Sequence, residues 1–168
     1  MRKKINKSLQ QGFTVIEILL YMGIFSILLI VLMQFFTMIL STHAESQSTS
    51  SIDQDARFIL NRLSYDIHDA TTVSSPTLGS SCTWPAVPGC QLVFSNVTYS
   101  VVSGDLNLTQ GGVANVLNSN KTTLTSITFE TRGNSAAGSK KSVQIKFTLQ
   151  SKINTNTAKS FQLTVSTR

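Results

Sequence analysis

The chain has 168 residues, and only 13% of them are charged although 41% are hydrophobic. That charged fraction is about half of the ~25% typical of globular proteins. Serine and threonine fill the difference, with 23 and 20 copies. This composition excludes a highly charged disordered tail and a coiled-coil rod rich in Glu and Lys. Two cysteines are too few for a dense disulfide scaffold.

The net charge of +6 is concentrated at the N-terminus. Four cations fall within the first seven residues, at Arg2, Lys3, Lys4 and Lys7. The rest of the chain has 10 cations against 8 anions. A chain that is nearly neutral beyond its first residues has no broad phosphate-binding surface.

The segment from Ile18 to Leu40 carries no formal charge, and the uncharged run continues to Thr42. About 20 apolar residues cross the ~30 Å hydrocarbon layer as a helix. The segment therefore predicts a membrane span, and the preceding cations place the N-terminus in the cytoplasm and the rest outside. A buried helix of a soluble protein and a removed signal peptide are the alternatives. The signal peptide would need a shorter apolar region of about 7–15 residues and a small-residue cleavage site.

Glu17 stands at the start of this apolar segment. An acidic side chain at such a place is a functional hypothesis by default, because the membrane interior disfavours charge. The structural alternative is a carboxylate that offsets the dipole at the start of a helix, worth roughly 0.3–1 kcal/mol.

The short basic leader, Gly12, Phe13-Thr14 and Glu17 before an apolar helix together resemble the N-terminal signature of type IV prepilins and type II secretion pseudopilins. In that family a membrane peptidase cuts after the glycine and methylates the new N-terminal phenylalanine. The resemblance implies cleavage between Gly12 and Phe13, N-methylation of Phe13 and an assembly role for Glu17. The implied partners are a prepilin peptidase/methyltransferase, other pilin or pseudopilin subunits contacted through the N-terminal helix, and an inner-membrane assembly platform.

Cleavage after Gly12 would create a free α-amine at Phe13, near the depth of the Glu17 carboxylate. When subunits stack, the amine of one copy can meet the carboxylate of its neighbour. Leaving either charge buried and unpaired would cost several kcal/mol. We therefore expect the pair to set the register between subunits more than to add net stability.

Beyond the span, apolar residues recur at helical spacing. They are Ile52, Ala56, Ile59, Leu63, Ile67 and Ala70. The pattern predicts a nearly continuous helix from about Thr14 to Ala70, interrupted at most in the hydroxyl-rich stretch 41–51. Pro76 forbids its continuation.

Two ion pairs at i,i+4 spacing are expected on the sides of this helix, Asp53–Arg57 and Arg62–Asp66. Residues 56–70 resemble the second half of the long helix in the PilW/PulJ group of minor pilins and pseudopilins. There an Arg-Phe pair precedes Leu-rich turns and an Asp-Ile step. This resemblance implies a minor subunit.

Residues 76–90 are predicted to form a loop that holds Cys82 and Cys90. Outside the cytoplasm these two cysteines are expected to form a disulfide. Closing such a loop is worth roughly 2.5 kcal/mol. A metal site with His43 or His68 is the alternative, although neither histidine has ligand spacing to the cysteines.

The remaining chain alternates apolar with polar residues over six predicted strands. They are 92–94, 97–102, 105–108, 124–129, 143–149 and 161–165. Ser103-Gly104 predicts a hairpin turn, and 133–139 a longer loop. The expected fold is α+β and type IV pilin-like, with one long N-terminal helix packed on a C-terminal antiparallel β-sheet.

Four segments follow from this interpretation. Residues 1–12 form the leader, 13–42 the membrane or filament-core helix, 43–72 the amphipathic half of the helix, and 73–168 a globular β domain with the disulfide loop 82–90.

No catalytic motif stands out in the chain. Four aspartates cluster in sequence but spread over more than one helix face, at Asp53, Asp55, Asp66 and Asp69. Paired-carboxylate catalysis would need two of them to converge in a cleft. We expect no cofactor, no metal and no enzyme activity. Lysines toward the C-terminus could touch DNA or an acidic surface ligand, although solvated strand edges explain them as well.

The sequence thus favours a membrane-inserted precursor of a filament subunit, a minor pilin or pseudopilin with a priming or tip role. Before assembly it would be a single-pass protein of the cytoplasmic membrane, and afterwards part of an extracellular or periplasmic filament. The filament system to which the subunit belongs would decide whether it serves attachment, twitching motility, DNA uptake or secretion. The alternative is a single-span anchored extracellular binding domain that does not polymerise.

Overall fold

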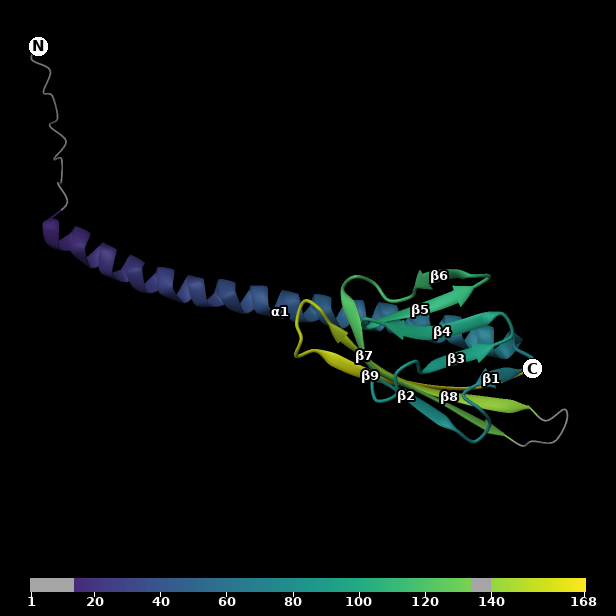
Figure 1. Ribbon diagram of the computed structural model, residues 1–168. Coiled ribbons are helices and arrows are strands. Elements are labelled where there is room, and N and C mark those ends of the chain that lie inside the picture. The colour runs from purple at the N-terminus through teal and green to yellow at the C-terminus, as the bar shows by residue number, and fades with distance from the viewer. Residues whose placement is uncertain (1–13, 134–139) are drawn as a thin grey trace, which may run out of the picture. The chain divides into compact units, whose positions relative to one another are not determined.

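The computed structural model describes residues 14–133 and 140–168, and the chain divides into two compact units, Met1–Thr42 and His43–Arg168. Helix α1 (Val15–Asp69) begins in the first unit and ends in the second (Figure 1). Its bounds confirm the predicted 14–70 helix to within one residue at each end. The hydroxyl-rich stretch 41–51 is helical throughout.

Three serines of this stretch, Ser41, Ser48 and Ser51, bond to the helix backbone. Ser48 Oγ donates to the Ala44 carbonyl at 2.8 Å, and Ser51 Oγ donates to the Gln47 carbonyl at 2.9 Å. Such bonds to the preceding turn satisfy the hydroxyl without ending the helix. The helix ends at Asp69, where the Ala70 amide bonds to the Ile67 carbonyl at 3.2 Å.

In the described residues of the second unit, nine strands follow the helix. They are β1 (Val73–Ser75), β2 (Ser81–Trp84), β3 (Gln91–Phe94), β4 (Val97–Val102), β5 (Asp105–Gln110), β6 (Val113–Val116), β7 (Thr122–Gly133), β8 (Lys141–Ser151) and β9 (Ala158–Ser166). All pairings are antiparallel.

These strands form two sheets where one was expected. Sheet A has the order β1-β3-β4-β5-β6, and sheet B has the order β2-β7-β8-β9. Figure 1 shows the two sheets beside the second half of α1. The α+β, type IV pilin-like fold is confirmed, with one long helix packed against antiparallel sheets.

A single hydrophobic core joins α1 to both sheets. The predicted apolar stripe of the helix is confirmed, since its six members are all between 0% and 3% exposed: Ile52, Ala56, Ile59, Leu63, Ile67 and Ala70. Sheet A contributes buried side chains such as Phe94 and Tyr99, and sheet B contributes Phe129 and Phe147. The buried stripe of α1 therefore packs against side chains of both sheets in one core.

The predicted Ser103-Gly104 turn is confirmed between β4 and β5. Both residues have positive φ, 54° and 83°, as tight hairpin turns require. The Gly104 carbonyl accepts the Leu124 amide of β7 at 2.7 Å. A Cβ on Gly104 would lie 2.5 Å from Thr123 Oγ1, so glycine permits this close approach between sheets A and B.

Two local predictions were wrong. The stretch 76–90 is not all loop, because residues 81–84 form β2 and pair with β7. Asp53 does not form the expected pair with Arg57 but binds Lys159 Nζ of β9, with both carboxylate oxygens at 2.9 Å. A long-range partner thus replaced the local one. Of the predicted loop 133–139, residues 134–139 lie outside the described residues.

Candidate processing and assembly site

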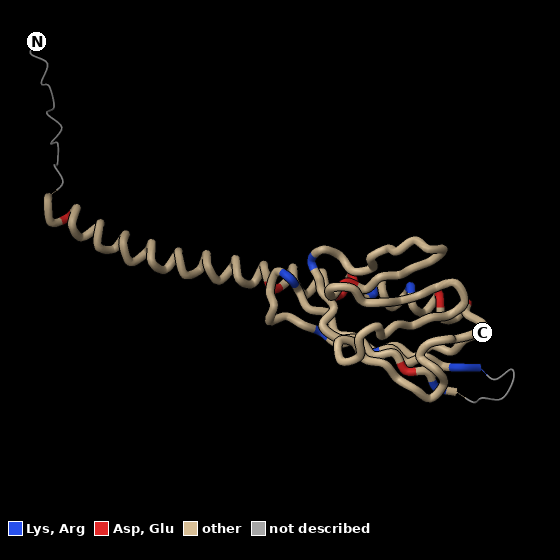
Figure 2. The backbone as a smooth tube through the Cα atoms, in the orientation of Figure 1, with Lys and Arg blue, Asp and Glu red and all other residues tan. Residues whose placement is uncertain are grey.

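The predicted cleavage position, Gly12 and Phe13, lies outside the described residues. Glu17 lies in the first turn of α1, where its amide bonds to the Thr14 carbonyl at 3.1 Å. It is the sole charged residue among residues 14–42, and Figure 2 shows it as a single red position at the start of the helix. Its side chain is half-buried.

A side chain one turn further along the helix contacts the Glu17 carboxyl. Tyr21 Oη donates a hydrogen bond to Glu17 Oε1 at 3.2 Å. The sequence interpretation missed Tyr21, although its i+4 spacing from Glu17 was a usable signal.

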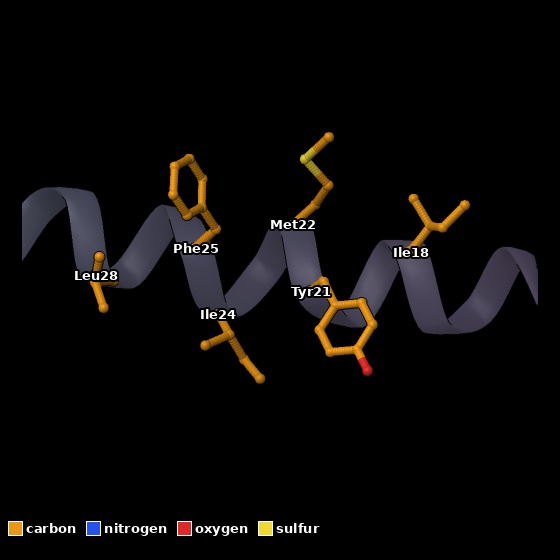
Figure 3. A pocket seen from close by; sticks show the side chains of 6 residues that line it. All are labelled: Ile18, Tyr21, Met22, Ile24, Phe25 and Leu28. Atoms are coloured by element: carbon orange, nitrogen blue, oxygen red, sulfur yellow. The ribbon is translucent and has the colours of Figure 1, made fainter. Parts of the chain in front are cut away.

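The rest of this helical segment presents apolar side chains on every face. Between Val15 and Leu40, its large hydrophobic side chains are 44% to 77% exposed. Figure 3 shows six of the segment's side chains pointing away from one helix in different directions. Helix α1 is long and apolar enough to cross a membrane. A helix with such a surface needs lipid or other helices around it.

In the second unit, the predicted Arg62–Asp66 pair is confirmed. Arg62 Nε lies 2.8 Å from Asp66 Oδ2. The same oxygen accepts a hydrogen bond from Tyr99 Oη of β4 at 2.5 Å. Burial raises the pKa of the Tyr99 phenol above its ordinary value, and the hydrogen bond to Asp66 raises it further. The cluster of Arg62, Asp66 and Tyr99 thus binds α1 to β4 of sheet A.

Asp55 and Asp53 bind separate partners in the β structure. Asp55 Oδ2 accepts the Ser119 amide at 3.0 Å and the Ser119 hydroxyl at 2.8 Å, and it also accepts the Thr122 hydroxyl. Asp53, as described, binds β9. Together with Asp66, which binds Tyr99 of β4, these two carboxylates attach the helix to three different places in the β structure.

Asp66 and the exposed Asp69 do line one small cleft of about 310 Å³, together with Arg62, Tyr65 and Gln110. Arg62 Nη2 donates to Gln110 Oε1 at 3.3 Å across it. Asp66 already accepts hydrogen bonds from Arg62 and Tyr99, so its role in this cleft is to hold α1 against β4.

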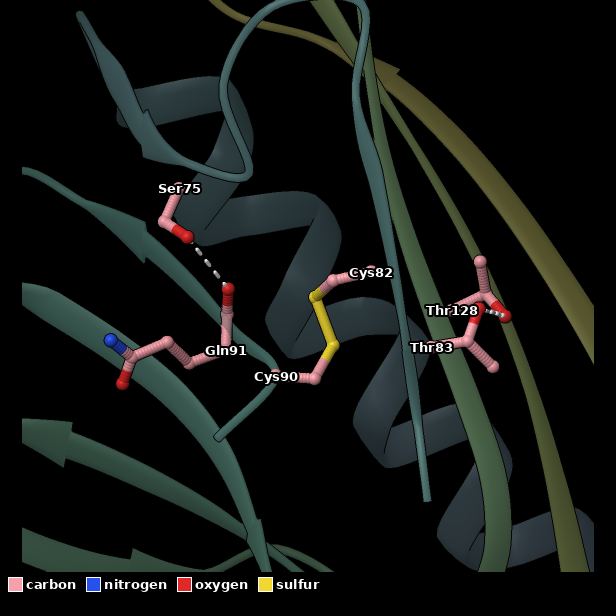
Figure 4. Close-up of a disulfide and its surroundings, with 6 residues drawn as sticks. All are labelled: Ser75, Cys82, Thr83, Cys90, Gln91 and Thr128. Atoms are coloured by element: carbon pink, nitrogen blue, oxygen red, sulfur yellow. Dashed lines mark hydrogen bonds between the residues drawn. A yellow bond between two sulfur atoms is a disulfide. The ribbon is translucent and has the colours of Figure 1, made fainter. Parts of the chain in front are cut away.

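The two cysteines form a disulfide, with Cα atoms 5.6 Å apart. Cys82 belongs to β2 of sheet B, and Cys90 immediately precedes β3 of sheet A. Figure 4 shows the bond between these two strands. Both sides are fixed further by hydrogen bonds, one between the Thr83 and Thr128 hydroxyls at 2.9 Å and one from the Ser75 hydroxyl to the Gln91 carbonyl at 3.3 Å.

The histidines named as alternative metal ligands are both exposed, and the cysteines are joined to each other. Across residues 14–133 and 140–168 the structure brings together no group of three His, Cys, Asp or Glu side chains that could hold a metal ion. Two of the C-terminal lysines have anionic partners, Lys159 with Asp53 and Lys152 with Asp105 at 3.7 Å. Lys146 lies exposed on β8.

Residues 7–33 match the family model described as the prokaryotic N-terminal methylation motif. The matched stretch contains Gly12, Phe13 and Glu17. Neither the comparison with curated proteins nor the comparison with solved structures gave a match.

This motif and the type IV pilin-like fold support a type IV pilin-like precursor. Proteins of that family are structural, not catalytic. The motif implies processing by a prepilin peptidase and assembly with other pilins. The motif and the apolar N-terminal helix also fit anchoring in a membrane.

Proposed function

We propose that this chain is a minor pilin or pseudopilin, of the PilW/PulJ kind, in a type IV pilus or a related secretion filament. It is inserted in the cytoplasmic membrane, cut between Gly12 and Phe13, N-methylated at Phe13, and assembled through the apolar part of α1. The observation that carries the type IV pilin-like part of this proposal is the match over residues 7–33, which contains the predicted cut position between Gly12 and Phe13, and also Glu17.

The geometry of the first unit supports this role. Its apolar side chains are exposed all round, so a copy that leaves the membrane must exchange lipid for neighbouring helices. Glu17 is the one formally charged side chain among residues 14–42. Pairing it with the Phe13 amine of a neighbouring copy compensates both charges and fixes the register of the two helices.

The second unit supports a role at the tip or in priming. Its helix half is fixed to both sheets by a shared core, to sheet A also by the hydrogen bond from Tyr99 to Asp66, and to sheet B also by the ion pair of Asp53 with Lys159. It therefore forms a firm base for exposed loops. In the assembled filament, we propose that this subunit contacts other pilin subunits, the inner-membrane assembly platform, and a DNA or surface ligand at the tip.

The test is the N-terminus of the exported protein, measured by mass spectrometry. We expect a chain that begins at Phe13 and carries one added methyl group. Gly12→Arg should block the cut, whereas Asn6→Arg adds the same charge within the leader and should leave the cut unchanged. An exported protein that still begins near Met1 would show a plain single-span anchor and refute the filament proposal.

A further inference from the structure

The five hydroxyl groups between Tyr21 and Thr42 have two kinds of partner. Four of them donate to a backbone carbonyl three or four residues earlier, at 2.8–3.0 Å: Ser26, Thr37, Ser41 and Thr42. Such bonds hide a hydroxyl from lipid within its own helix. Tyr21 differs, because its hydroxyl donates to a side chain, Oε1 of Glu17, at 3.2 Å.

Helix geometry explains why a tyrosine reaches this carboxyl. Long side chains in helices lean toward the N-terminus, over the residue four positions earlier. Figure 3 shows the Tyr21 oxygen pointing toward the end of the segment where Ile18 lies. The shorter hydroxyls of the segment reach only their own backbone, so the size of the phenol makes the contact with Glu17 possible.

The apolar surroundings make the hydrogen bond between Tyr21 and Glu17 stabilising for both side chains. The side chains grouped with Tyr21 on this surface are apolar: Ile18, Met22, Ile24, Phe25 and Leu28. In lipid, a carboxyl without a partner is costly, and so is a phenol whose hydroxyl has no acceptor. One hydrogen bond partly compensates both.

We propose that Tyr21 is the hydrogen-bond partner of Glu17 in the lipid-embedded single subunit, and that it holds the carboxyl until the amine of a neighbouring copy becomes the main partner. The second half of this inference rests on the proposed function. A hydrogen bond is worth more to an uncompensated carboxylate than to one already paired with a cation. Tyr21 therefore stabilises the single subunit more than the paired one, and it maintains a pool of unassembled subunits.

The contact itself is tested on the full-length chain in phosphatidylethanolamine and phosphatidylglycerol vesicles by infrared spectroscopy. The band that disappears in Glu17→Gln identifies the Glu17 carboxyl. Tyr21→Phe should shift this band, and Tyr65→Phe, at an exposed tyrosine of the second unit, should not. Because the uncut chain has no amine at Phe13, this measurement does not depend on the proposed function. An unmoved band in Tyr21→Phe would overturn the inference.

The effect on pairing is tested on chain processed by co-expression with a prepilin peptidase, with its mass checked for a Phe13 N-terminus. Energy transfer between labelled copies in the same vesicles gives their association. Tyr21→Phe should strengthen association about threefold, the effect of one hydrogen bond inside a membrane. In a Glu17→Gln background it should change nothing.

Unchanged or weaker association of Tyr21→Phe, or an equal gain in the Glu17→Gln background, would overturn the role of Tyr21 in pairing. A chain that the peptidase does not cut after Gly12 refutes the proposed function instead. The mass measurement therefore separates the two failures.

Discussion

At the scale of single residues, buried polar groups connect parts of the chain that are distant in sequence. Asp66 on α1 receives hydrogen bonds from Arg62 on the same helix and from Tyr99 on β4. Tyr99 is fully buried, so its hydroxyl has no access to water. Buried polar groups stabilise a fold only when they are paired, and this cluster meets that condition.

We expect Tyr99→Phe to lower the free energy of unfolding by about 1–2 kcal/mol at neutral pH, because Asp66 loses a buried donor. The effect should depend on pH. The folded-state pKa of Tyr99 is raised above its unfolded value of about 10. Its contribution is therefore complete below about pH 10 and falls as the pH rises further, since only the unfolded chain then loses the proton.

The measurement is denaturant unfolding of both proteins in detergent micelles between about pH 9 and about pH 11. Fluorescence of Trp84, the single tryptophan, reports on sheet B. Titrations of other groups occur in both proteins and cancel in the comparison. A stability difference that stays constant over this range would show that the Tyr99 proton does not contribute.

At the scale of elements, α1 changes its surface along its length. In the first unit its apolar side chains are exposed on all faces, and in the second unit one stripe is buried against the sheets. Neighbouring residues in this second half can therefore have opposite environments. Ile59 is fully buried, whereas Phe58 is 54% exposed.

We expect Ile59→Ala to lower the free energy of unfolding by about 2–4 kcal/mol, because it leaves a cavity in the shared core. Phe58→Ala removes a larger side chain from the next position, yet it should cost less than about 0.5 kcal/mol, as exposed sites do. Denaturant unfolding followed by Trp84 fluorescence measures both. Equal losses would contradict the assignment of the buried face.

At the scale of the whole second unit, the disulfide joins the two sheets. Cys82 lies in β2, which pairs only with β7 among the described strands, and Cys90 leads into β3 of the other sheet. The bond therefore fixes the edge of sheet B to sheet A in addition to closing its own short loop.

We expect the double variant Cys82→Ser, Cys90→Ser to lose about 2.5 kcal/mol of unfolding free energy, from the loop-closure entropy of the unfolded chain. The measurement is again denaturant unfolding. Reductant should destabilise the wild-type protein by the same amount and leave the double variant unchanged. A wild-type protein unaffected by a reductant that opens the bond would contradict this role.

Local patterns in the sequence predicted much of this molecule because the physics behind them is local. The helix, its stripe from Ile52 to Ala70 and the Ser103-Gly104 turn follow from periodicity and backbone preference within a few residues. The same holds for Arg62–Asp66, whose partners are one helical turn apart. Glu17 stood out because the membrane interior disfavours charge, so a charged residue in a long apolar segment indicates a function.

Three strands escaped prediction for identifiable reasons. β1 has three residues, and all four residues of β6 are exposed, so neither shows an alternating pattern. β2 becomes a strand by pairing with residues more than forty positions away, Ser81 with Glu130 and Trp84 with Ile127. No short window of sequence contains that pairing.

The sequence by itself determined the helix, its two kinds of surface, the placement of the one charge in the apolar segment and most of the strands. Only the tertiary structure decided that the strands divide into two sheets, that Asp53 binds Lys159 and not Arg57, and that Tyr99 closes over Asp66. The physical reason is distance along the chain. Helix periodicity acts over a few residues, whereas sheet division and buried polar pairing depend on which remote segments meet in the core.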